Sequence, residues 1–69
     1  MEIRKKFGKR LRQLREERGW SQEEFADRAG LHRTYVSAVE RGVRNPTLSV
    51  IERLAKALGV SLAEMLGGM

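Results

Sequence analysis

The stretch SQEEFADRAGLHRTYVSAVERG, residues 21–42, decides the fold of this chain. It predicts two short helices joined by a tight turn. Ser21 and Glu24 have the spacing of a capping box, in which each side chain satisfies the backbone amide of the other residue at a helix start. Gly30 supplies the positive-φ residue that an abrupt change of helix direction needs. We therefore expect residues 21–42 to form two helices set at an angle.

The second of these helices has an outer face suited to contact with a polar partner. By helical periodicity, this face and its flanks comprise Arg33, Thr34, Tyr35, Ser37, Ala38 and Arg41. Its side chains are small or polar in the middle, and cations stand at both ends. Such a surface is narrow enough and positive enough to enter a groove.

Apolar residues recur at helical spacing on both sides of this stretch and predict two further helices. These positions are Ile3, Phe7, Leu11 and Leu14 in the first helix, and Leu48, Ile51, Leu54, Ala55 and Leu58 in the fourth. Either Asn45 with Pro46 or Thr47 can cap the fourth helix. A second capping box at Ser61 and Glu64 predicts a fifth helix. Because no strand pattern is present, we expect an all-α, compact five-helix fold over residues 1–69.

Length and composition restrict the classes of function. Sixty-nine residues are enough for one small domain. The chain has no cysteine and one histidine, so no catalytic constellation and no metal or cofactor site is expected. Because 69 residues leave none for an effector domain, no small-molecule ligand is expected either. Without a signal peptide or a long apolar run, we expect a cytoplasmic protein and no membrane partner. Fourteen Lys and Arg against nine Asp and Glu give a net charge of +5, which favours a polyanionic partner.

The motif and the segment after it resemble a known family. The positions that carry the resemblance are Gln22, Ala26, Gly30, Val36, Glu40 and Gly42, followed by RNPTLSVIERLAKALGVS. They resemble the helix-turn-helix family of lambda repressor and Cro, often called the XRE family, over about residues 7–66. Within it, GLHRTYVSAVERGVRN is most similar to the controller proteins of restriction–modification systems. The resemblance implies a lambda-repressor-like fold and a dimeric transcriptional regulator that places a recognition helix, residues 32–42, in the major groove of a palindromic operator.

The resemblance also implies roles for single residues. The base-reading positions are Arg33, Thr34, Tyr35, Ser37 and Ala38. The positions that contact the DNA backbone are Gln22, Arg41, Arg44 and Asn45. His32 stands where the family usually has a Ser or Asp cap, so we expect a recognition helix with a weaker cap. We interpret His32 as a histidine at a buried edge or facing phosphate, rather than as a pH switch or a metal ligand.

Two charged residues lie toward the predicted core. Arg15 follows Leu11 by one helical turn, and Glu40 follows Val36 by one turn. The family has an arginine–glutamate ion pair at the matching positions, so we expect a structural ion pair between Arg15 and Glu40. The alternative is that both side chains tilt outward into solvent.

Eight of the fourteen cationic residues lie in the first predicted helix. They are Arg4, Lys5, Lys6, Lys9, Arg10, Arg12, Arg15 and Arg18. They form either a solvated face or a surface that contacts DNA phosphates through the N-terminal end of the helix.

The C-terminal region, residues 59–69, is the predicted dimer interface. Leu62, Met65, Leu66 and Met69 supply more apolar surface than a helix at a chain end needs for its own docking. For Leu62 and Met65, a position in the core is the alternative. The expected partners are double-stranded DNA and a second copy of this chain, and RNA polymerase is a further candidate.

A second class of function remains open, because the same fold can serve as a protein-interaction adaptor or an antitoxin. A protein-binding recognition helix would be expected to expose Leu, Phe or Met. Thr34, Ser37 and Arg41 are not of this kind. The sequence therefore favours binding to double-stranded DNA.

Overall fold

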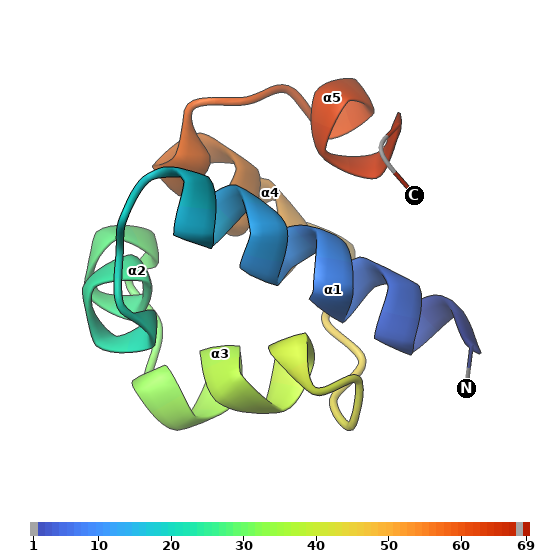
Figure 1. Cartoon of the computed structure of the whole chain (residues 1–69), viewed down its shortest axis with the longest axis horizontal. Coiled ribbons are helices and arrows are strands. Elements are labelled where there is room, and N and C mark those ends of the chain that lie inside the picture. The colour runs from blue at the N-terminus through green and yellow to red at the C-terminus, as the bar shows by residue number, and fades with distance from the viewer. Residues whose placement is uncertain (1, 68) are drawn as a thin grey trace.

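Five helices make up the computed structural model, which describes residues 2–67 and 69. They are α1 (Glu2–Glu17), α2 (Gln22–Ala29), α3 (Arg33–Glu40), α4 (Leu48–Leu58) and α5 (Leu62–Gly67). In Figure 1, α1 crosses the molecule diagonally with α4 behind it, α2 lies at the left, α3 runs along the bottom, and α5 lies at the upper right. The described residues contain no strand, so the predicted all-α class is confirmed.

Local hydrogen bonds set the helix boundaries near the predicted positions. The Ser21 hydroxyl accepts a hydrogen bond from the backbone amide of Glu24 at 3.0 Å and begins α2. The Glu24 carboxylate accepts from Arg28 at 2.9 Å instead of from the Ser21 amide, so only the Ser21 half of the predicted capping box is formed. In α5 both halves of the capping box are present, each at 3.0 Å between Ser61 and Glu64. The hydrogen bond from the Ser61 amide lowers the pKa of the Glu64 carboxyl.

The structure shows how the turn at Gly30 is closed and which residue caps α4. Gly30 has a φ of 70° at the end of α2, and the amide of Leu31 donates to the carbonyl of Ala26 at 2.8 Å. This bond closes the turn between α2 and α3. Thr47, rather than Asn45 with Pro46, caps α4: its hydroxyl accepts from the Val50 amide at 3.3 Å.

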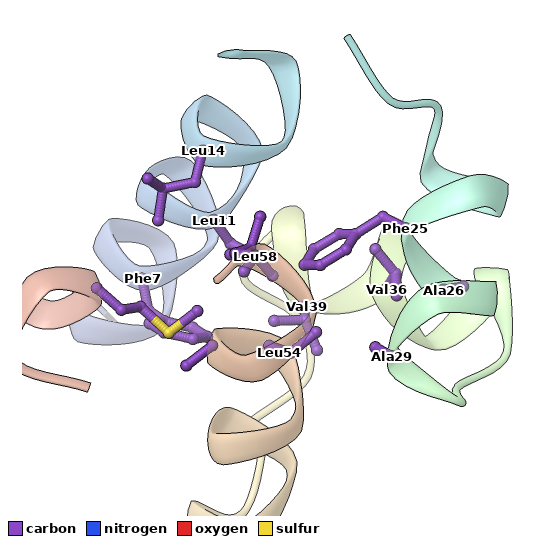
Figure 2. Packing of buried hydrophobic residues seen from close by; sticks show 12 residues of the cluster. Phe7, Leu11, Leu14, Phe25, Ala26, Ala29, Val36, Val39, Leu54 and Leu58 are labelled. Carbon is purple, nitrogen blue, oxygen red and sulfur yellow. The ribbon is translucent and has the colours of Figure 1, made fainter. Parts of the chain in front are cut away.

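Side chains from all five helices form one apolar core. Its members are Phe7, Leu11, Leu14, Phe25, Ala26, Ala29, Val36, Val39, Leu54, Ala55, Leu58 and Met65. Figure 2 shows Leu11, Phe25 and Leu58 meeting where α1, α2 and α4 approach one another. Ile3 and Leu48, which the periodicity placed in the core, are 53% and 80% exposed. Each lies in the first turn of its helix, outside the packed middle.

Arg10 in α1 and Arg18 just after it hold the ends of other helices. Arg10 donates from Nε to the carbonyl of Met65 at 3.1 Å and from Nη2 to that of Glu64 at 3.0 Å. Arg18 donates to the carbonyl of Leu58 at 3.0 Å. These bonds satisfy carbonyls in the last turns of α5 and α4, which have no partner within their own helices. Arg10 and Arg18 therefore donate hydrogen bonds within the protein, whereas the sequence predicted for them only a solvated or phosphate-contacting face.

A glycine allows α1 and α3 to cross closely. Gly8 is buried in the middle of α1, and α1 packs against α3. A Cβ atom at Gly8 would lie 2.4 Å from the carbonyl oxygens of both Val39 and Glu40. Only glycine fits at this crossing, which brings the end of α3 against α1. No motif or periodicity in the sequence marks Gly8.

Candidate nucleic-acid interface

The outer face of α3 is open, as periodicity predicted. Arg33, Thr34 and Arg41 are exposed, and Ser37 and Ala38 are half-buried. The residues of α3 that fill the interior are Val36, Val39 and Glu40. This helix forms one edge of the molecule in Figure 1. Its polar side is therefore available to a partner, while its apolar side is held by the core.

A hollow of about 410 Å³ separates this face from the start of α2. We call it the α2–α3 hollow. Its lining residues are Ser21, Gln22, Glu23, Arg33, Thr34 and Ser37. The structure thus brings the predicted backbone contact Gln22 beside the predicted base-reading residues Arg33, Thr34 and Ser37. Arg33 pairs with no carboxylate among residues 3–67 and 69.

The predicted ion pair between Arg15 and Glu40 is present and buried. Arg15 Nε lies 2.7 Å from Glu40 Oε2, and Nη2 lies 3.1 Å from Oε1. The two side chains are 11% and 2% exposed. The hydrogen bond with Glu40 raises the pKa of the Arg15 guanidinium further above its already high usual value. A bidentate, charge-assisted pair of this kind fixes the orientation of both side chains.

The same ion pair holds Gln22. The Gln22 Nε2 donates to Glu40 Oε1 at 3.0 Å, and Arg15 Nη1 donates to the carbonyl of Trp20 at 2.7 Å. The end of α1, the turn before α2, the start of α2 and the end of α3 are thereby joined. Gln22 keeps its carbonyl oxygen and one N–H hydrogen for a partner in the hollow.

Arg41 and Arg44, the cations that follow α3, lie beside it, whereas Asn45 lies elsewhere. The guanidinium of Arg44 stands 5.2 Å from the centre of the half-buried Tyr35 ring. Arg41 donates from Nε to the carbonyl of Ser37 at 3.3 Å. Asn45 instead lines a pocket with Ile3 and residues of α4 and α5. Arg44 is therefore placed next to the outer face of α3, and Asn45 borders a different surface.

His32 does not lie at a buried edge and does not leave the helix start uncapped, while its predicted contact with phosphate stays a prediction. It is exposed and is the N-cap residue of α3. Its Nδ1 accepts a hydrogen bond from the backbone amide of Thr34 at 3.2 Å. An imidazole nitrogen can replace the oxygen of Ser or Asp here because a neutral ring carries one lone pair as an acceptor. Helix α3 therefore has a side-chain cap.

The predicted interface residues of α5 divide into two groups. Leu62, Leu66 and Met69 are 42%, 42% and 38% exposed. Met65 is fully buried, which corrects its assignment to the interface. Because α5 packs against α1 and α4, and Arg10 bonds to the Met65 carbonyl, this side chain points into the core.

An open pocket of about 440 Å³ adjoins the exposed end of α5. Its apolar lining comprises Ile3, Phe7, Pro46, Ile51, Leu66 and Met69, with Arg4 and Asn45 at the same pocket. We call the partly or fully exposed apolar residues Ile3, Ile51, Leu66 and Met69 the terminal apolar face. Ile3 and Ile51 were not predicted to share a surface with α5, since only the fold brings these segments together.

Residues 2–67 and 69 hold no group of three metal-ligating side chains. None of the helices described is both long enough and apolar enough to span a bilayer.

Comparison with known proteins places the chain in a family. A family model described as helix-turn-helix matches residues 11–65. The chain belongs to this helix-turn-helix family. It is a helix-turn-helix transcriptional regulator, and this family does not consist of enzymes.

Several relatives of this helix-turn-helix protein are restriction–modification controller proteins. Control protein C.BamHI of Bacillus amyloliquefaciens is 48% identical over 65 residues, which are 93% of this chain and 80% of the relative. The structure of C.AhdI from Aeromonas hydrophila is 49% identical with a TM-score of 0.89 and covers 91% of each chain. C.Esp1396I, solved as a tetramer with its natural 35 base-pair operator, is 33% identical with a TM-score of 0.89, over 96% of this chain and 87% of that one.

Proposed function

We propose that this helix-turn-helix protein is a sequence-specific regulator that binds double-stranded DNA with α3 in the major groove. The observation that carries the proposal is the open polar face of α3 beside the α2–α3 hollow. The major groove is about 12 Å wide and admits one α-helix. With α3 in the groove, Arg33, Thr34 and Ser37 would face base edges. The other proposed base-reading residues are Tyr35 and Ala38.

The residues at the rim of this face suit the phosphate backbone. Gln22 lines the hollow at the start of α2, where backbone amides of a helix N-terminus also favour an anion. Arg41 and Arg44 stand at the far end of α3 and are exposed. These contacts would fix the position of the protein without reading sequence. Asn45 stays a weaker candidate because it lies at the pocket of the terminal apolar face.

Two observations favour DNA over the adaptor or antitoxin alternative. The large exposed apolar side chains are Ile3, Val43, Leu48, Leu62, Leu66 and Met69, and none of them lies within α3. A protein-binding recognition helix would be expected to present such side chains. The relative C.Esp1396I was solved with its operator. Operator binding would place the protein with the DNA in the cytoplasm.

The first prediction concerns Arg33. A guanidinium can donate to guanine O6 and N7 together, and Arg33 stands exposed in the first turn of α3. We expect Arg33→Ala to lower discrimination at one base position by about 1 to 3 kcal/mol. Selection of bound sequences from random duplex DNA identifies the position, and titration of matched duplexes measures the loss.

Changes at Lys5, Lys6 and Lys9 are the control for this prediction. These lysines are the exposed cations of α1 whose side chains make no bond within residues 3–67 and 69, because Arg10, Arg12 and Arg15 bond there and Arg4 is half-buried. Their replacement by Ala should weaken all sequences alike and reduce the salt dependence of binding. Equal losses on random and selected DNA for Arg33→Ala would contradict its assignment to base reading.

We further propose that the protein binds a palindromic operator as a homodimer through the terminal apolar face. One short recognition helix reaches few base pairs, and two of them on half-sites about one DNA turn apart read enough sequence for specificity. Ile3, Leu66 and Met69 are 53%, 42% and 38% exposed around an apolar pocket. Leu62, which is 42% exposed on the same helix as Leu66, lies outside this pocket and stays a candidate for the interface. A twofold contact would cover this surface on both copies. RNA polymerase is a further candidate partner, on surfaces that the DNA and the second copy leave open.

The second prediction tests the dimer. Sedimentation of the wild type at micromolar concentration should show twice the 7.9 kDa mass of one chain. Leu66→Glu should give the monomer, because it places a charge on the apolar face without disturbing the core. Lys56→Glu, on an exposed position of α4 that does not line the pocket, should remain dimeric. A wild type that sediments as a monomer with and without operator DNA would rule out the dimer.

A further inference from the structure

His32 and Thr34 form two hydrogen bonds whose directions can be deduced. His32 Nδ1 lies 3.2 Å from the backbone nitrogen of Thr34 and 2.7 Å from its hydroxyl oxygen. A backbone nitrogen can only donate, so Nδ1 carries a lone pair and no hydrogen. The Thr34 hydroxyl must then donate its hydrogen to Nδ1 as well. The neutral imidazole carries its hydrogen on Nε2.

This arrangement leaves the exposed Thr34 side chain with one kind of hydrogen bond to offer. A threonine hydroxyl has one hydrogen and two lone pairs, so a free one can donate or accept. Here the hydrogen is committed to His32, and Oγ1 has only acceptor capacity left. Thr34 lines the α2–α3 hollow between Arg33 and Ser37. Its remaining lone pairs are therefore available to whatever occupies that hollow.

We propose that His32 determines base specificity by holding Thr34 as a hydrogen-bond acceptor. In the major groove, adenine N6 and cytosine N4 are donors, whereas guanine N7 and O6 and thymine O4 are acceptors. Thr34 accordingly selects adenine or cytosine on the strand that it faces. This inference rests on the proposed function, in which α3 enters the major groove. It adds His32, which need not touch a base, to the residues that set specificity.

The rival explanation is that His32 serves only as the helix cap. The bond to the Thr34 amide accounts for capping by itself, and a cap would stabilise α3 without regard to the base. Two substitutions separate the roles. His32→Gly removes the acceptor, yet glycine is tolerated at an N-cap. His32→Asn keeps an acceptor oxygen for both Thr34 donors.

The experiment measures affinity for four duplexes that differ only at the base pair that Thr34 faces. That position is the one at which Thr34→Val, which keeps the side-chain shape and removes the hydroxyl, changes base preference. The wild type and His32→Asn should prefer adenine or cytosine there by about five-fold, the factor that one net hydrogen bond supplies. His32→Gly should lose this preference and keep the preference read by Arg33. Circular dichroism of each free variant checks that α3 is intact.

Each other outcome overturns the inference. A wild type that prefers guanine or thymine at this position would show that Thr34 donates. Retention of the adenine or cytosine preference in His32→Gly would show that His32 is a cap alone. If Thr34→Val changes base preference nowhere in the site and Arg33→Ala does change it, the inference about His32 fails, and the proposal that α3 reads DNA stands. If the wild type distinguishes no duplex from random DNA, the proposed function itself fails.

Discussion

Arg15→Met is expected to lower the free energy of unfolding by about 3 to 5 kcal/mol, because it leaves a buried carboxylate without its charged partner. The Glu40 side chain is only 2% exposed, so water cannot replace the guanidinium. Glu40→Leu should cost a similar amount, since it removes the acceptor for both Arg15 and Gln22. The double change should cost much less than the sum, because apolar side chains of similar size can fill the site.

Chemical denaturation of the four proteins in a double-mutant cycle measures this coupling. The exposed pair of Arg12 and Glu16, 64% and 55% exposed, is the matched control. Arg12→Met and Glu16→Leu should each cost less than about 1 kcal/mol. Losses of stability this small, with no coupling energy between Arg15 and Glu40, would mean that the pair behaves as a solvent-exposed one. The expected result also implies that DNA binding is lost through unfolding, without any contact between this pair and DNA.

Gly8→Ala is expected to destabilise the fold by about 3 kcal/mol or more, the upper range for overpacking. The added Cβ would meet the carbonyl oxygens of Val39 and Glu40 at 2.4 Å. These are backbone atoms, so the clash is relieved only if α1 and α3 move apart. Such a shift would also disturb the Glu40 carboxylate and the start of α2 that it holds through Gln22.

Whether Gly8→Ala lowers or raises stability separates two effects. Helix propensity alone would make alanine more stable than glycine by about 1 kcal/mol, whereas the clash would make it less stable. Gly67→Ala is the matched control: Gly67 is also helical, and a Cβ there meets nothing within 4 Å. Denaturation curves should show Gly67→Ala to be as stable as the wild type or slightly more stable. A stabilised Gly8→Ala would contradict the close crossing of α1 and α3.

The sequence alone predicted the features that depend on near neighbours in the chain. The cap at Ser21, the turn at Gly30 and the box at Ser61 and Glu64 are satisfied by atoms within a few residues. The outer face of α3 follows from helical periodicity, which needs no knowledge of other helices. The ion pair of Arg15 and Glu40 came from the family resemblance together with two inward-facing charges.

Tertiary structure alone decided which surfaces meet. Helical spacing predicted that Ile3 and Leu48 face the core, and Met65 was predicted at the dimer interface. The docking of the helices leaves Ile3 and Leu48 exposed and buries Met65. Arg10 and Arg18 looked like other cations of α1, but they bond to carbonyls 40 or more residues away.

Gly8 carries no local signal either, because the neighbour that requires its missing side chain is the backbone of α3. The direction of the Thr34 hydroxyl likewise depends on the rotamer of His32 in the folded chain. Short-range hydrogen bonds and helical periodicity are encoded within a few residues. Burial and close approach depend on where distant segments pack, and for this protein the fold decides them.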